Sequence, residues 1–176
     1  SKDNAEKSTT LTYGYDVALG IASIIGKETA FGEAFHITSD ESYTWKEILE
    51  IYLDTIEKKT GMRPKVLLLD KSPQLEWIGA KWQVILDRYY NRRFDNSKIQ
   101  QYIDTSQFVR TESGLISCLE SFLCHPQFKK MGWGIQGTYD RINGEWAPFS
   151  EISIIKDCIS YLLHRTVVPP KSQLYI

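Results

Sequence analysis

Hydrophobic side chains recur at helical spacing along much of the chain, and the clearest repeat lies between residues 45 and 60. Its apolar positions are Trp45, Ile48, Leu49, Tyr52 and Ile56. These positions fall on one stripe of an α-helix. Thr44 and Glu47 have the T-x-x-E spacing of a capping box at the start of this helix. Gly61 is suited to the helix end, and Pro64 prevents continuation. The pattern predicts an amphipathic helix with well-defined ends.

Weaker repeats predict four further helices. They cover approximately residues 17–25, 72–86, 111–123 and 151–164. Asp16 is a candidate N-cap and Gly26 a candidate C-cap of the first of these helices. Gly20 lies inside it, where glycine costs about 1 kcal/mol relative to alanine, so we expect a neighbouring segment to pack closely there. In the second helix, Trp82 and Leu86 fall on the expected inner face.

Two short apolar runs, at residues 34–38 and 66–69, are typical of buried strands rather than helices. The amphipathic helix lies between them in the sequence. A strand, helix, strand order of this length suits a parallel crossover unit. We therefore expect a few short parallel strands in a helix-rich α/β chain.

Composition limits the function classes without choosing one. The chain has 176 residues, 42% of them hydrophobic and 24% charged, which is ordinary for a globular protein. A net charge of −1 gives no electrostatic reason to expect nucleic acid or an anionic membrane as a partner. No apolar run approaches the roughly 20 residues that cross a bilayer. The three cysteines lack metal-type spacing and favour a reducing compartment, so we expect a soluble, cytoplasmic protein.

A literal G-x-G-x-x-G occurs at Gly132, Gly134 and Gly137. A dinucleotide loop of this pattern must leave a buried strand and open a helix. Neither pattern flanks these glycines, and residues 131–149 are rich in Gly and Trp. We therefore interpret the segment as a glycine-rich turn that wraps over the surface, and we predict no cofactor-binding residue in it.

Four segments occur together in the order of a known family. They are TLTYGYDVALGIASIIG (10–26), GEAFHITSDESYTWKEI (32–48), FDNSKI (94–99) and ESGLISCLESFLCHP (112–126). Over roughly residues 10–141 this series resembles the substrate domain of the extended short-chain dehydrogenases, specifically the NAD-dependent epimerase/dehydratase group. Each motif alone is weak, and the specificity comes from four motifs in order at natural spacing.

The resemblance implies a C-terminal portion of a Rossmann-type α/β fold from which the dinucleotide-binding half is missing. Residues 1–141 would form the substrate-binding domain, and residues 142–176 an extension with one helix. The family's glycine-rich loop and catalytic Tyr-x-x-x-Lys have no counterpart in this chain. We therefore assign no catalytic residue, expect NAD or NADP in the parent protein, and expect the chain alone to bind neither.

The resemblance also indicates candidate substrate-binding residues. Arg92 and Arg93 could bind an anion such as a phosphate, or could belong to a solvated connector with local ion pairs. His36, Thr38 and Ser39 would line the substrate pocket if the end of their strand faces the missing domain. A structural role for His36 is the alternative. The histidines are far apart in the sequence, and we predict no metal site.

The function implied by these residues is substrate binding within an NAD(P)-dependent epimerase, dehydratase or reductase acting on a sugar or nucleotide sugar. The expected partners are the missing N-terminal domain and a small sugar-like molecule. The face left uncovered would favour self-association. Two departures, Tyr15 in place of the first acidic residue and no Arg near Thr9, leave a second interpretation open. This is a non-catalytic binding or interaction module on the same scaffold.

Overall fold

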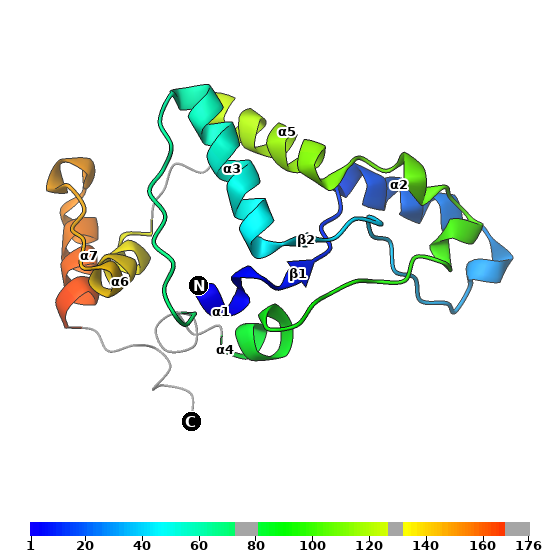
Figure 1. The fold of residues 1–176 in the computed structure, drawn as a ribbon, viewed down its shortest axis with the longest axis horizontal. Coiled ribbons are helices and arrows are strands. Elements are labelled where there is room, and N and C mark those ends of the chain that lie inside the picture. Colours follow the sequence, from blue (N-terminus) through cyan, green and yellow to red (C-terminus); the bar gives the residue numbers. More distant parts are fainter. Residues whose placement is uncertain (73–80, 127–131, 168–176) are drawn as a thin grey trace. The chain divides into compact units, whose positions relative to one another are not determined.

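The structure is a computed structural model that describes residues 1–72, 81–126 and 132–167 (Figure 1). It divides into two compact units, each built from segments that are distant in the sequence. The first, here called the αβ unit, comprises Ala5–Lys65 and Tyr90–Pro126. The second, here called the hairpin unit, comprises Ser1–Asn4, Val66–Tyr89 and the residues after Pro126.

The αβ unit holds three longer helices, a strand pair and several short helical turns. Its helices are α2 (Gly14–Ile24), α3 (Trp45–Thr60) and α5 (Thr111–Cys124), and its strands are β1 (Ser8–Thr9) and β2 (Tyr43–Thr44). Its 3-10 turns are η1 (Glu28–Ala30), η4 (Ile99–Gln101) and η5 (Thr105–Gln107). The strands pair antiparallel, with Ser8 opposite Thr44 and Thr9 opposite Tyr43. Helix α1 (Lys2–Ala5) belongs to the hairpin unit as far as Asn4, and its last residue, Ala5, begins the αβ unit.

Helix α3 confirms the strongest pattern in the sequence. The Thr44 hydroxyl accepts the Glu47 N–H at 3.1 Å, and the Glu47 carboxylate accepts the Thr44 N–H at 2.7 Å, which completes the capping box. Gly61 ends the helix at φ 74°, a left-handed conformation that glycine adopts without steric cost. Helix α3 lies beside α5 (Figure 1), and a Lys59–Glu120 ion pair joins the two at 3.1 Å.

Helix α2 forms where it was expected, but Asp16 does not cap it. The residue before the helix is Tyr13, without a side-chain cap. Asp16 is buried in the first turn, where its carboxylate accepts the Val109 N–H at 2.9 Å. The prediction was wrong because a distant backbone donor, which local sequence does not show, takes the carboxylate. The expectation at Gly20 is confirmed, since a Cβ there would collide with the Ile37 side chain.

The predicted parallel strands are not formed. Within the described ranges, the backbone N–H groups of residues 34–37 have no hydrogen-bond partner, and the segment is not a strand. Val66, Leu67 and Leu68 are exposed rather than buried, and they are not a strand either. An apolar run becomes a strand only when another strand supplies its hydrogen bonds. The observed strands are the short antiparallel pair β1–β2.

The hairpin unit is organised around α6 (Trp133–Asn143) and α7 (Ile155–Thr166), which pack against each other (Figure 1). Between them lies the 3-10 turn η6 (Phe149–Glu151). The G-x-G-x-x-G segment therefore opens a helix, and the predicted surface turn was wrong. Gly137 is buried against the Tyr161 carbonyl, and Gly134 lies against His164. The glycines let two helices approach closely, a packing role that glycine spacing alone does not distinguish from phosphate binding.

The rest of the hairpin unit includes α4 (Lys81–Gln83) and the π-helical turn η3 (Val84–Arg88). The predicted helix over 72–86 falls partly on residues 73–80, outside the described residues. In its described part, Trp82 and Leu86 are exposed instead of facing inward. Near the chain start, Asp3 accepts hydrogen bonds from the Tyr89 hydroxyl at 2.6 Å and the Ser72 N–H at 3.1 Å.

The expected division at residue 141 stays a prediction. Residue 141 lies within α6, and the helix expected in the C-terminal extension corresponds to α7. No helix in the described parts of the chain combines the length and the apolar content that a membrane crossing requires.

Candidate functional site

The best-defined polar junction of the αβ unit lies where the segment before β2 meets the connector after residue 90. Asn96, 4% exposed, is at its centre. Its side-chain oxygen accepts from the Thr38 N–H at 3.2 Å and the Thr38 hydroxyl at 2.9 Å. Its amide nitrogen donates to the Thr38 carbonyl and to Asp40 Oδ1, the latter at 3.0 Å. Four hydrogen bonds use the full capacity of the amide.

Ser39 extends the junction toward α5. Its N–H donates to the Thr12 hydroxyl at 2.9 Å, and its own hydroxyl accepts the Glu41 N–H at 3.1 Å. The Thr111 hydroxyl lies 3.4 Å from the Ser39 hydroxyl and donates to it. Thr38 and Ser39, both expected to bind substrate, thus use their hydroxyls within the protein. The junction fixes the turn that presents Asp40.

Glu41 secures the same turn to the start of α5. Its carboxylate accepts the Thr111 N–H at 2.6 Å and the Arg110 Nε–H at 3.2 Å. Burial acts to raise the pKa of Glu41, but these hydrogen bonds and the Arg110 charge outweigh it, so the pKa lies below its usual value. An ionised Glu41 therefore stabilises this part of the fold.

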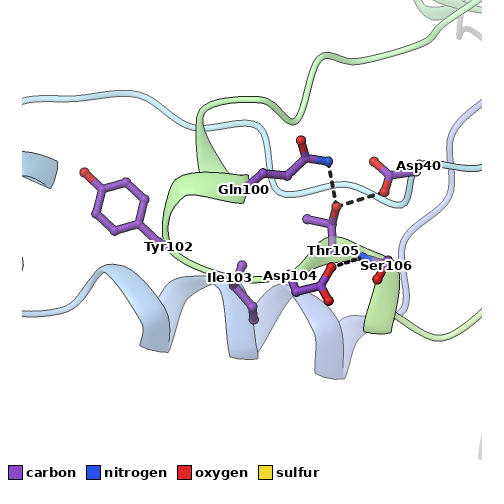
Figure 2. Close-up of a pocket in the computed structure, with 7 residues that line it drawn as sticks. All are labelled: Asp40, Gln100, Tyr102, Ile103, Asp104, Thr105 and Ser106. Atoms are coloured by element: carbon purple, nitrogen blue, oxygen red, sulfur yellow. Dashed lines mark hydrogen bonds between the residues drawn. The ribbon is translucent and has the colours of Figure 1, made fainter.

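Asp40 leads from the junction into a pocket of about 550 Å³, here called the Asp40 pocket (Figure 2). It is lined by Asp40, Gln100, Tyr102, Ile103, Asp104, Thr105 and Ser106. Asp40 Oδ2 accepts the Thr105 hydroxyl at 2.8 Å, and Thr105 Oγ1 accepts from Gln100 Nε2 at 2.9 Å. Figure 2 shows these three side chains turned toward one another. The volume lies within the roughly 300–1,000 Å³ of small-molecule sites.

The Asp40 pocket is acidic. Two of its lining residues, Asp40 and Asp104, carry carboxylates, and none is Lys or Arg. Hydrogen bonds from the Ser106 side chain and from the Ser106 backbone hold the pKa of Asp104 below its usual value. The Ser106 N–H donates to Asp104 Oδ1 at 3.0 Å. Asp104 is therefore ionised near neutral pH. The pocket offers hydrogen-bond acceptors and a negative potential.

The predicted arginine pair does not line the Asp40 pocket. Arg92 Nη2 donates to the Thr9 hydroxyl at 2.6 Å, and the Arg92 N–H donates to the Ser8 carbonyl at 3.0 Å. Arg92 therefore connects the start of the connector to β1, whereas Arg93 is exposed. Anion binding by the two residues stays a prediction, and the structure gives Arg92 a structural contact as well.

His36 is also placed apart from the Asp40 pocket. It is exposed, and its ring meets Phe94 edge to face at a centroid distance of 5.1 Å. Of the predicted substrate-binding residues, the structure brings Thr38 and Ser39 to the junction and leaves His36 and the arginines outside it. Sequence reasoning missed Asp40, Gln100 and the turn residues 102–106, because no spacing relates residue 40 to residue 104.

A second, apolar pocket of about 160 Å³ lies between the segment before α2 and helix α5. Its lining includes Tyr13, Gly114, Leu115 and Cys118. Gly114 lies against the Tyr13 ring. A Cβ added at Gly114 would lie 3.3 Å from Tyr13 Cδ2, which is tighter than most Cβ contacts in proteins. This pocket lies where the first of the four motif segments packs on the fourth.

Over the described residues, no three His, Cys, Asp or Glu side chains are grouped so that they could hold a metal ion. The same residues form no glycine loop between a strand and a helix, since the one G-x-G-x-x-G is used in helix packing. Scans against protein-family models, curated proteins and solved structures find no match to this chain.

Proposed function

We propose that the chain is the substrate-binding part of a cytoplasmic NAD(P)-dependent epimerase, dehydratase or reductase that acts on a sugar or nucleotide sugar. One observation carries the proposal: the four segments that resemble this family all belong to the αβ unit. The intervening residues 66–89 belong to the hairpin unit. A chance set of weak motifs has no reason to meet in one compact unit.

The contacts between the segments use residues of the motifs themselves. Gly114 of the fourth segment packs on Tyr13 of the first. Asn96 of the third holds Thr38 of the second through its side-chain amide. These contacts support an inherited scaffold, since each depends on a residue that the resemblance had already placed in a motif.

The parent protein would need a second domain for its chemistry. A bound NAD or NADP would accept and return a hydride. The described residues contain no strand-to-helix glycine loop, so we expect the missing domain to hold the cofactor. No reaction step is therefore assigned to this chain, whose contribution would be to bind and orient the substrate.

Two exposed features support the docking of such a domain. Residues 34–37 have backbone N–H groups without a partner in the described structure, as at the open edge of a sheet. Helix α2 exposes the apolar residues Tyr15, Leu19 and Ile21. A strand at the edge of a partner domain would accept hydrogen bonds from the N–H groups of residues 34–37, and the same domain would cover the apolar side chains of α2.

The alternative is a non-catalytic binding or interaction module. It is favoured by the use of polar groups at the junction: the Thr38 and Ser39 hydroxyls and the Arg92 guanidinium all make contacts within the protein. Groups used in this way are less free to bind a substrate. The two functions differ in whether a cofactor is needed.

The deciding experiment compares the full product of the native gene with this 176-residue chain. Intact mass gives the length of the native product, and fluorescence titration measures NADH and NADPH binding to both proteins. We expect the native product to be longer and to bind a cofactor, and the chain alone to bind none. We also expect the chain alone to self-associate and to bind a hydrophobic dye more strongly than the native product does. A native product that binds neither cofactor would contradict the proposal and support the alternative.

A further inference from the structure

We propose that the Asp40 pocket binds an uncharged polyhydroxylated ring and discriminates against its phosphorylated form. The inference rests on the proposed function only for the identity of this ring as a substrate. Binding itself depends on the pocket and can be measured without a cofactor.

The Asp40 carboxylate is a pre-oriented acceptor. Its two oxygens are held by the Asn96 side-chain amide at 3.0 Å and by the Thr105 hydroxyl at 2.8 Å. Each carboxylate oxygen has two lone pairs, so each can accept one more hydrogen bond. Because Asn96 and Thr105 are buried, the carboxylate does not need to be ordered when a ligand arrives.

Asp104, the N-cap residue of the turn η5, supplies a second carboxylate. Its Oδ1 accepts the Ser106 N–H at 3.0 Å, which fixes the side chain at the pocket wall. Hydrogen bonds from hydroxyl groups to carboxylates are charge-assisted and stronger than those between neutral groups. Adjacent hydroxyls on a sugar ring are donors of this kind. The Gln100 amide and the Ser106 hydroxyl line the same pocket and add groups that can donate as well as accept.

Tyr102 and Ile103 give the pocket its apolar part (Figure 2). The Tyr102 hydroxyl donates to the Thr29 hydroxyl at 2.8 Å, and its ring packs edge to face on Phe35 with centroids 5.5 Å apart. Both contacts hold the aromatic ring in place. A sugar ring has a C–H face as well as hydroxyls, and a pocket lined by Tyr102 and Ile103 together with two carboxylates offers contacts to both.

The charges around the pocket oppose a phosphate. No described lining residue is cationic, and two cations of the same unit are paired elsewhere: Lys98 with Glu33 and Arg110 with Glu41. A phosphate placed between Asp40 and Asp104 would meet like charges at short range without compensation. The pocket therefore favours the neutral ring, in contrast to the anion site expected at Arg92 and Arg93.

The test is a binding titration of the 176-residue chain by ligand-observed NMR. The probes are neutral hexoses (glucose, galactose and mannose) and their 6-phosphates. We expect saturable binding of at least one neutral hexose, and binding at least about tenfold weaker for its 6-phosphate. Asp104→Asn retains a capping side chain but removes a charge. It should lower the affinity for the neutral hexose about tenfold and reduce the difference in affinity between the hexose and its 6-phosphate.

Gln100→Ala and Gln101→Ala form a matched pair, because both residues are exposed on η4 but only Gln100 lines the pocket. We expect weaker hexose binding in the first variant and unchanged binding in the second. The proposal is overturned if no neutral hexose binds, if the 6-phosphate binds as tightly, or if the two glutamine variants behave alike. Cofactor binding by the native product, measured separately, would still support the proposed function in each of these cases.

Discussion

At the scale of single residues, Asn96 and Asp16 show what a linear sequence conceals. Both are short polar residues near turns, for which a local cap is the usual expectation. In the structure each holds a segment that is distant in the chain: Asn96 holds Thr38, and Asp16 holds the Val109 N–H. Nothing in the neighbouring residues distinguishes the two roles. The resemblance to a family placed Asn96 in a motif but did not give its partner.

Replacing Asn96 by Ala should destabilise the αβ unit by about 2 kcal/mol, because the Thr38 backbone groups and Asp40 would lose buried partners. Asn96→Asp should be at least as harmful, since the new carboxylate cannot donate to the Thr38 carbonyl and faces Asp40. Urea denaturation measures both effects. Asn143→Ala, at an exposed position of α6, is the control and should change stability by less than about 0.5 kcal/mol. Equal stability of all the variants would show that the junction contributes nothing.

Glu41 should make stability depend on pH on the acid side. Its pKa is lower in the folded protein than in the unfolded chain, so its contribution is present above the unfolded pKa and is lost as pH falls through the folded pKa. Glu41→Gln removes this ionisation. We expect the wild type to have a higher urea midpoint than the variant near pH 7, and the two midpoints to converge in acid. A constant difference across the acid range would mean that Glu41 does not titrate as described.

At the scale of elements, helices were easier to predict than strands because their signals are local. The capping box, apolar stripe and terminal glycine of α3 all lie within the helix and its flanks. A strand depends on a partner, and the apolar runs at residues 34–38 and 66–69 have none in the described structure. The prediction of a surface turn at the glycines of α6 was wrong for a related reason. These glycines pack against α7, which follows later in the chain, so their role cannot be read from their own spacing.

The α6–α7 contact gives a prediction at this scale. Gly137→Ala would place a methyl group against the Tyr161 carbonyl and 3.2 Å from the Arg165 backbone nitrogen, so the helices must separate. Overpacking of this kind costs about 1–3 kcal/mol. Gly132→Ala is the matched control, because its Cβ would have ordinary contacts, the nearest at 3.6 Å from Ile135. Thermal unfolding, followed by the fluorescence of Trp133 and Trp146 beside Tyr161, should show a loss only for Gly137→Ala.

At the scale of the whole molecule, apolar side chains remain exposed in both units. Ile21 and Ile25 are exposed on the α2 side of the αβ unit, and Ile155 and Ile159 are exposed on α7. Contiguous apolar surface is uncommon on a monomeric protein and usually marks an interface. The expected self-association therefore stays a prediction with a physical basis. Sequence patterning located these side chains on helix faces, but it could not state which faces lack a cover.

The open backbone of residues 34–37 has a practical consequence under the proposed function. A strand supplied on a separate polypeptide can pair with such an unpaired extended segment. The chain and its cofactor-binding counterpart would then behave as the two halves of a split reporter, whose signal records their reassembly. Replacing the exposed Ala34 by proline would remove a backbone donor from this segment and disable the reporter, without removing the Phe35 ring that packs on Tyr102.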